Sequence, residues 1–111
     1  DFISLHVPLT DKTFHLVDKK FLESLKTTAY LINTSRGAVV NQNALTMALK
    51  KKVISGAAID VFESEPPTDL EFLSSPNLMV TPHIGGNARE AILAMGNSAI
   101  GHLLDFYKFT V

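Results

Sequence analysis

The chain of 111 residues has no cysteine, no excess of charge of one sign and no long apolar run. Without cysteine it can form no disulfide, no thiolate nucleophile and no zinc–thiolate site. Ten basic side chains nearly balance eleven acidic ones, and no basic stripe is available for a nucleic acid. A membrane helix needs about 20 apolar residues, whereas the best candidate, 53–62, is interrupted by Ser55, Gly56 and Asp60. These absences argue against nucleic acid and membrane partners.

The composition that remains is that of a single globular domain. Hydrophobic residues make up 46% of the chain and charged residues 19%, a balance that argues against disorder. No signal peptide opens the sequence, and without a membrane span this points to a cytoplasmic location. The chain begins in a strand-like run after Asp1, without an initiator methionine, so we expect upstream sequence to be missing.

Short apolar segments alternate with segments of helical periodicity along the whole chain. The predicted strands are 2–7, 29–32, 56–61 and 78–80. The predicted helices are about 18–26, a helix capped by Asn41 with an apolar face of Ala44, Leu45, Ala48 and Leu49, and a long helix over about 87–107. This alternation predicts an α/β fold with a Rossmann-like parallel sheet, and strands that are apolar throughout indicate helices on both of its faces.

The long last helix is expected to begin with a capping box, in which Asn87 and Glu90 satisfy the first backbone N–H groups. Its predicted apolar face consists of Ala88, Ile92, Met95, Ala99 and Leu103. The basic cluster at 50–52 falls where the middle helix should end, and cations there complement the helix dipole. The proline-rich segment 64–77 is predicted to be rich in loops.

Polar residues gather where each predicted strand ends. His6 follows the first strand, 34–36 the second, 60–65 the third and His83 the fourth. The carboxyl ends of parallel strands meet at one edge of a sheet, and this is where ligands bind in open α/β sheets. The sequence therefore predicts one site built from four separate segments.

His83 is the candidate acid–base group, because a histidine can take up or release a proton near neutral pH. Gly85 and Gly86 follow it and would let a ligand approach the backbone closely. A lone histidine is more often structural, so catalysis would also need a carboxylate that orients the ring. Glu65, held before two prolines, is the candidate for that role, whereas Glu63 is interpreted as a solvated surface charge.

Arg36 is the candidate anion-binding group, since it closes a strand and precedes Gly37. Its planar guanidinium suits carboxylates, phosphates and ketone oxygens. Taken alone, however, this arginine is explained equally well by a salt bridge to a neighbouring helix.

Four motifs in order, covering essentially the whole chain, resemble the D-isomer-specific 2-hydroxyacid dehydrogenases. This family includes phosphoglycerate dehydrogenase, glyoxylate/hydroxypyruvate reductase and D-lactate dehydrogenase. The motifs are 6–10 (HVPLT), 33–37 (NTSRG), 58–66 (AIDVFESEP) and 77–86 (NLMVTPHIGG). Four motifs of this length with natural spacing make the resemblance specific, unlike a lone glycine motif.

The resemblance implies hydride transfer between a nicotinamide cofactor, NAD or NADP, and a small 2-hydroxy acid or 2-keto acid. It makes Arg36 the residue that holds the substrate, His83 the acid and base at the carbonyl oxygen, and Glu65 the partner of His83. It assigns Asp60 to the nicotinamide carboxamide. The other positions implied to border the cofactor, together with Arg36 and His83, are His6, Val7, Pro8, Thr34, Ser35, Gly85 and Gly86. It implies no metal site and a homodimer in the full-length protein.

The sequence also departs from the family pattern. The Gly-x-Gly-x-x-Gly turn that cradles pyrophosphate and the acidic ribose-binding residue are absent, as is the substrate domain. We therefore expect the chain to be the second half of an NAD(P)-binding domain that binds its cofactor weakly and turns over little alone. The particular hydroxy acid and the choice between NAD and NADP depend on residues outside this sequence.

Other kinds of protein with the same fold are alternatives to a hydroxyacid dehydrogenase. A dinucleotide-sensing corepressor that binds partner peptides would not need the intact trio of Arg36, Glu65 and His83. Formate dehydrogenase usually carries glutamine where this chain has Glu65. An inert relative whose activity has decayed is a third alternative; the intact trio argues against it, although a truncated gene product would look identical.

Overall fold

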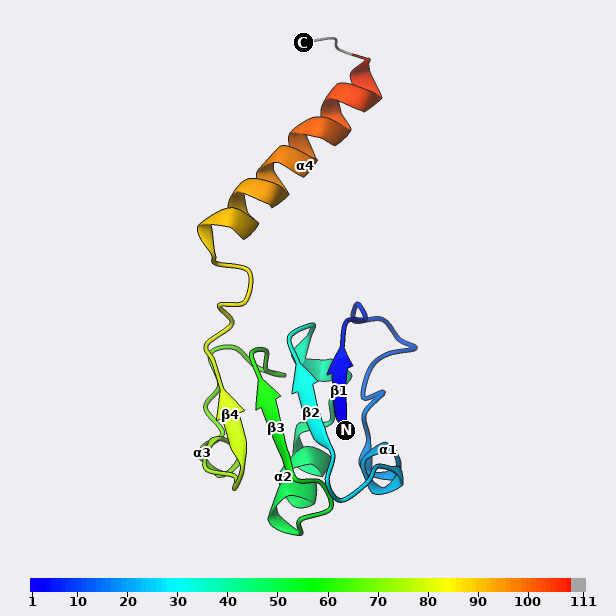
Figure 1. Ribbon diagram of the computed structural model, residues 1–111, viewed down its shortest axis with the longest axis vertical. Helices are drawn as coiled ribbons and strands as arrows, with labels where there is room; N and C mark the ends of the chain where they lie inside the picture. Colours follow the sequence, from blue (N-terminus) through cyan, green and yellow to red (C-terminus); the bar gives the residue numbers. More distant parts are fainter. Residues whose placement is uncertain (109–111) are drawn as a thin grey trace.

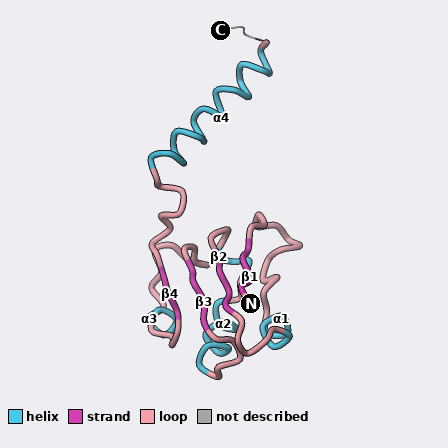
Figure 2. Tube along the Cα trace, in the orientation of Figure 1, coloured by secondary structure: helices cyan, strands magenta, loops and turns pink. Residues whose placement is uncertain are grey.

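The computed structural model describes residues 1–108, with a four-stranded sheet at its centre (Figure 1). The strands are β1 (Phe2–Leu5), β2 (Tyr30–Asn33), β3 (Gly56–Ile59) and β4 (Leu78–Val80). They lie in chain order, and each pairs in parallel with the next. The predicted α/β fold with a parallel sheet is confirmed, and Figure 2 shows the loops that connect its strands and helices.

All four strands stop at the same level of the sheet. Leu5 is the register partner of Asn33, Asn33 that of Ile59, and Ile59 that of Val80. β1 and β3 are each two residues shorter than predicted. Strand pairing ends at the register level of these four residues, and the segment after each strand turns away into a loop. Four loops therefore start from one line across the sheet.

Four α-helices and a short 3₁₀ helix follow the strands. They are η1 (Gly37–Val39), α1 (Lys19–Ser24), α2 (Gln42–Lys50), α3 (Leu70–Leu73) and α4 (Arg89–Tyr107). α2 begins as predicted, since Asn41 Oδ1 accepts a hydrogen bond from Ala44 N at 2.9 Å. The segment 64–77 is rich in loops as predicted, but it also contains α3, where Asp69 Oδ1 accepts a hydrogen bond from Phe72 N at 3.0 Å. A helix of one turn is too short to produce a detectable period.

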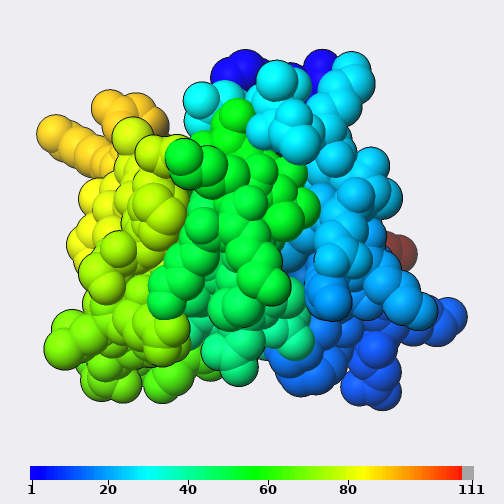
Figure 3. Space-filling model, turned by 90° about the horizontal axis from the view of Figure 1, so that it is seen from below, coloured from blue at the N-terminus to red at the C-terminus, as the bar shows by residue number. Residues whose placement is uncertain are grey.

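The core lies between one face of the sheet and the helices α1, α2 and α3. Alternate residues of each strand point to this face. The buried members of the hydrophobic core from the strands and α2 are Leu5, Leu31, Ala57, Ile59, Leu45, Ala48 and Leu49. Ala44, at the edge of the predicted apolar face of α2, is partly buried against the same cluster. Figure 3 shows the sheet and its helices from below, where segments that follow one another in the chain lie side by side.

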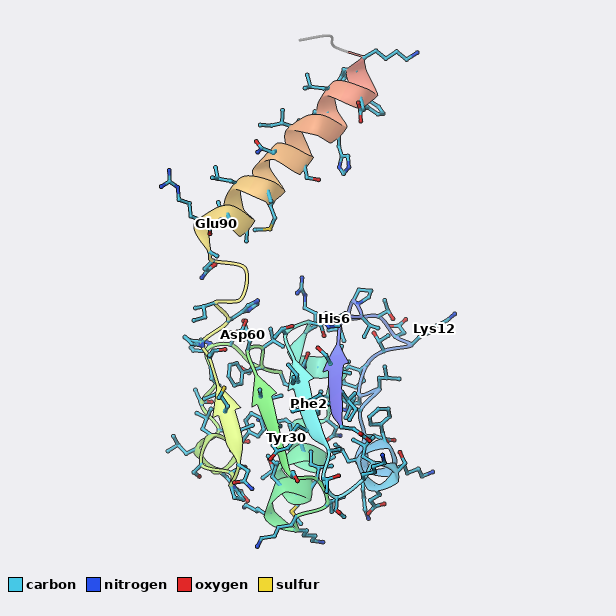
Figure 4. The ribbon with its side chains drawn as sticks, in the orientation of Figure 1. Phe2, His6, Lys12, Tyr30, Asp60 and Glu90 are labelled. Carbon is cyan, nitrogen blue, oxygen red and sulfur yellow. The ribbon has the colours of Figure 1, made fainter. Side chains whose placement is uncertain are left out.

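The opposite face of the sheet is open in the described part of the chain, so the prediction of helices on both faces was wrong here. Phe2 is 76% exposed and Met79 68% exposed. The ring of Phe2 stacks on that of Tyr30 with centroids 5.4 Å apart, and both lie on the strands in Figure 4. The apolar side chains on this face explain the prediction, but none of the described helices covers them.

The long helix α4 extends away from the sheet (Figure 1), and none of its residues is buried. The predicted apolar face of this helix is therefore solvent-exposed. The capping box was also wrong, because Ala88 is the N-cap and no side chain caps the helix. Asn87 N instead donates to Ile84 O at 3.0 Å and closes a turn before the helix begins. None of the described helices combines the length and apolarity that a bilayer span requires.

Candidate active site

The loops that leave the four strands lie along one edge of the sheet, as predicted. Figure 4 shows His6, after β1, and Asp60, after β3, on this edge. The polar residues form two groups, one from the loops after β1 and β2 and one from the loops after β3 and β4.

The first group surrounds an open hollow of about 350 Å³. The residues that line it are His6, Val7, Pro8, Thr34, Ser35 and Arg36. The structure thus brings together six of the ten residues that the resemblance implied to border the cofactor. His6 is tied to β1, since its Nε2 lies 2.8 Å from Ser4 Oγ. That these residues bind a cofactor stays a prediction.

Asn33, the last residue of β2, shapes the loop that faces this hollow. Its side chain is buried, and Oδ1 accepts hydrogen bonds from Ser35 N at 3.1 Å and Ser35 Oγ at 2.9 Å. Its Nδ2 donates to Arg36 O at 3.0 Å. Asn side chains commonly fold their own backbone in this way. A separate role for Asn33 is not predictable from sequence, because its burial is visible only once the strands are paired.

Gly37 allows the loop after β2 to lie against the loop after β3. A Cβ atom on Gly37 would lie 1.9 Å from the carbonyl carbon of Phe62 and 2.5 Å from Glu63 N. Both neighbours are backbone atoms, so any side chain at this position would push the two loops apart. Glycine is therefore required where the segment containing Arg36 meets the segment containing Glu65.

Arg36 is exposed at the rim of the hollow. Its Nη1 donates to Ser35 O at 2.7 Å. Among residues 1–108 no salt bridge involves Arg36, so the alternative in which it pairs with a neighbouring helix is not observed. Its guanidinium does not contact Glu65 or His83 in this structure, but it lies on the same edge and can receive an anion.

His83 and Glu65 form the contact that the sequence predicted. His83 Nδ1 lies 2.7 Å from Glu65 Oε2, and Phe62 N donates to Glu65 Oε1 at 3.0 Å. Both side chains are partly exposed. The hydrogen bond with His83, and then that from Phe62 N, lower the pKa of Glu65. The carboxylate therefore stays charged at neutral pH and holds one nitrogen of the imidazole.

Asp60 anchors the segment that carries His83. Its Oδ1 accepts hydrogen bonds from Thr81 Oγ1 and from Ile84 N at 3.0 Å, and its Oδ2 accepts one from Gly85 N at 2.9 Å. Burial raises the pKa of Asp60, but the hydrogen bonds from Thr81, Ile84 and Gly85 outweigh this effect and the pKa is lowered. His83, between these anchor points, has a φ of 55° in the left-handed region. The structure thus shows Asp60 supporting His83, whereas its contact with a nicotinamide stays a prediction.

The two glycines after His83 have different surroundings. A Cβ atom on Gly85 would lie 3.0 Å from Asp60 Oδ2, whereas one on Gly86 would meet no atom within 4 Å. Gly85 therefore allows its N–H group to approach the buried carboxylate. Gly86 borders open space that a ligand could occupy.

Glu63 corrects the expectation of a solvated surface charge. Its Oε1 accepts a hydrogen bond from Gln42 N at 2.9 Å and lies 3.0 Å from His15 Nε2. The carboxylate thus joins the loop after β3 to the beginning of α2. This contact is missed from sequence because His15 and Glu63 are far apart in the chain.

The described residues contain no group of three or more acidic or histidine side chains that could hold a metal ion. Parallel α/β sheets bind ligands beyond the carboxyl ends of their strands, and both polar groups of this chain lie there. The fold and the site together define an α/β domain of the dinucleotide-binding type. Residues 1–85 match the family described as "D-isomer specific 2-hydroxyacid dehydrogenase, NAD binding domain". The chain belongs to this family.

The chain is similar to proteins of known activity and structure. It is 49% identical over 108 residues to a glyoxylate reductase of Thermococcus litoralis, covering 97% of this chain and 33% of the relative. An NADPH-dependent glyoxylate/hydroxypyruvate reductase from Sinorhizobium meliloti, solved with NADP and malonate, has a TM-score of 0.81 at 36% identity. The match covers 87% of this chain and 30% of the reductase. An NAD-dependent formate dehydrogenase from Staphylococcus aureus, solved with NAD, has a TM-score of 0.80 at 36% identity. The match covers 96% of this chain and 32% of the formate dehydrogenase.

The chain therefore spans about a third of the length of the glyoxylate reductase that it matches. The relatives named as reductases and dehydrogenases give no support to the corepressor alternative. The fold does not separate a hydroxyacid dehydrogenase from a formate dehydrogenase, since both are similar to this chain. The distinction expected from the carboxylate of Glu65 stays a prediction.

Proposed function

We propose that this chain supplies the acid–base half of an NAD(P)-dependent dehydrogenase that interconverts small 2-keto acids and 2-hydroxy acids. The observation that carries the proposal is the 2.7 Å contact of His83 Nδ1 with Glu65 Oε2, at the sheet edge that also holds Arg36. The names of the relatives, most of them glyoxylate reductases, support a small keto acid as the substrate.

His83 acts as the proton donor through Nε2. Its Nδ1 is engaged by Glu65, and its Nε2 has no partner among residues 1–108. As the carbonyl carbon of the substrate gains a hydride, the carbonyl oxygen takes the proton from Nε2, and imidazolium becomes imidazole. In the reverse direction the neutral ring removes the hydroxyl proton. The charged Glu65 stabilises imidazolium and orients the ring.

Arg36 binds the carboxylate of the substrate and polarises its carbonyl oxygen. The guanidinium presents several N–H donors in one plane, and only Nη1 is engaged within the described residues. Asn33 and Gly37 hold the loop that presents it. Arg36 makes no direct contact with Glu65 or His83, so the substrate would join them, with its carboxylate at Arg36 and its carbonyl oxygen at His83.

The residues present fit a nicotinamide cofactor, which when bound supplies the hydride. The open hollow of about 350 Å³ lies beyond β1 and β2, where a dinucleotide-binding sheet receives its ligand. The residues that would border it are Val7, Pro8, Thr34, Ser35 and Gly86. Because the glycine-rich phosphate turn is not in this sequence, we expect weak binding of NAD and NADP by the 111-residue chain and little turnover.

The test is a chimera in which this chain replaces the matching 108-residue segment of the T. litoralis glyoxylate reductase. We expect it to oxidise reduced cofactor with glyoxylate or hydroxypyruvate, and we expect His83→Asn to lower kcat by about 10²- to 10⁴-fold. Lys12→Gln, at an exposed loop position (Figure 4), is the control and should leave the rate unchanged. A folded, cofactor-binding chimera that reduces neither acid would contradict the proposal, as would a His83→Asn variant of full activity.

The assembly and location of the whole protein stay predictions. The homodimer and the cytoplasmic location come from the family resemblance and from the composition of the chain. Size measurement on the chimera, with the unmodified reductase as reference, tests whether this segment supports the oligomeric state of that enzyme.

A further inference from the structure

The segment 60–65 carries two glutamates that contact different parts of the chain. Glu65 contacts His83, whereas Glu63 contacts the body of the domain through His15 Nε2 and Gln42 N. The proposed function uses only Glu65. The contacts of Glu63 are not explained by that function, yet they connect the segment next to the acid–base pair to two other parts of the chain.

The first tie of Glu63 is to a histidine whose orientation is fixed. The ring of His15 stacks on Phe14 with centroids 3.9 Å apart, and its Nδ1 lies 3.2 Å from Asn41 Nδ2. Asn41 Oδ1 already accepts from Ala44 N, so the Asn41 amide can only donate to His15. His15 Nδ1 is then the acceptor, and the ring proton lies on Nε2, which donates to Glu63.

The second tie of Glu63 is to the start of α2. Gln42 is the first residue of this helix, and its N–H has no partner within the helix. A carboxylate at this position satisfies the N–H group and is favoured by the helix dipole. Asn41, which caps the same helix, also contacts His15, so α2 and His15 hold Glu63 together.

We propose that Glu63 is a positioning residue of the dehydrogenase: its ties to His15 and α2 hold the segment 60–65 so that Glu65 remains in contact with His83. The backbone makes this coupling direct. Phe62 N, adjacent to Glu63, donates to Glu65 Oε1 at 3.0 Å. Displacement of Glu63 therefore moves the donor that orients Glu65. The inference rests on the proposed function only in calling the pair catalytic.

The test measures the pKa of Glu65 by the ¹³C resonance of its side-chain carboxyl in the 111-residue chain, assigned by its loss in Glu65→Gln. The contact with His83 lowers the pKa of Glu65. In Glu63→Ala we expect the pKa of Glu65 to rise towards its ordinary value, because the contact is loosened. Loss of a nearby negative charge would by itself lower the pKa of Glu65, so the sign separates positioning from simple electrostatics.

Glu63→Gln is the conservative variant, since its amide oxygen can accept the same two hydrogen bonds. It should not raise the pKa of Glu65, which should stay at or slightly below that of the wild type because only the charge is lost. Glu71→Ala, which removes a surface glutamate paired with Lys50, is the charge-matched control and should have no effect. If Glu63→Ala does not fold, His15→Ala removes one tie with the Glu63 charge intact, and the pKa of Glu65 should again rise.

A pKa of Glu65 that is unchanged or lowered in folded Glu63→Ala, or in His15→Ala, would overturn the proposal. In the chimera we expect Glu63→Ala to lower kcat about tenfold, with KM for the cofactor within about twofold, and Glu63→Gln to restore kcat. A loss of kcat that Glu63→Gln does not restore would also overturn it. A chimera that is inactive with Glu63 intact contradicts the proposed function instead, and the titration of Glu65 still decides the role of Glu63.

Discussion

Replacing Gly37 by alanine would place a methyl group against the backbone of the neighbouring loop. The added Cβ would lie 1.9 Å from the carbonyl carbon of Phe62 and 2.0 Å from its oxygen. Non-bonded carbon atoms are best separated by about 3.5–4.0 Å, so the loops after β2 and β3 would have to part by about 1.5–2 Å. Neither can yield by rotating a side chain, because the clash is with main-chain atoms.

We expect Gly37→Ala to cost about 3 kcal/mol or more, at the upper end of the range for overpacked sites. For a domain of about 100 residues this corresponds to a fall in Tm of roughly 12 °C or more. The parting of the loops should also disturb the Glu65–His83 contact, since Phe62 N orients Glu65.

Thermal unfolding followed by circular dichroism measures this effect in the 111-residue chain. Gly86→Ala is the matched control, since its Cβ would meet no atom within 4 Å and its Tm should stay close to that of the wild type. A Gly37→Ala variant that unfolds within about 2 °C of the wild type would refute the reasoning, because one kcal/mol alone shifts Tm by about 4–8 °C.

Two further predictions concern the carboxylates of the site. His83 lowers the pKa of Glu65 in the folded chain, so the pair contributes stability above the unfolded pKa of Glu65 and loses it as pH falls through the folded pKa. The urea midpoints of wild type and Glu65→Gln should therefore converge as pH is lowered. A difference that stays constant with pH would contradict the stabilising contact between Glu65 and His83. Asp60→Asn replaces a buried acceptor with an amide N–H that faces a backbone donor, and should reduce the free energy of unfolding by about 1–3 kcal/mol in urea titrations. An effect below about 0.5 kcal/mol would mean that Asp60 does not anchor the His83 segment.

The sequence predicted those features of the fold that depend on local pattern. The apolar runs marked all four strands, Asn41 marked the start of α2, and the strand ends marked the edge where His83 and Glu65 meet. The errors arose where distant contacts decide the outcome. The apolar residues of β1 and β4 predicted a second layer of helices, but periodicity cannot tell whether this chain supplies that layer.

The roles of particular site residues were harder to predict than the site itself. The role of Asp60 at the cofactor stays a prediction, and its hydrogen bonds with the His83 segment were not anticipated from sequence. Glu63 looked like a surface charge because its partners, His15 and Gln42, are brought to it only by folding. Asn87 had the spacing of a cap, but its N–H closes a turn and the helix begins later. Such roles depend on hydrogen bonds that no single sequence segment contains.

The proposed proton transfer depends most on which nitrogen of His83 carries the proton. Long-range ¹H–¹⁵N spectra of the imidazole rings measure this directly. When the ring of His83 is neutral, we predict a proton on Nδ1, donated to Glu65, and a bare Nε2 directed at the substrate position. His15 serves as an internal reference, because its contacts predict the opposite form with the proton on Nε2. A neutral His83 that carries its proton on Nε2 would contradict the acid–base arrangement proposed for this site.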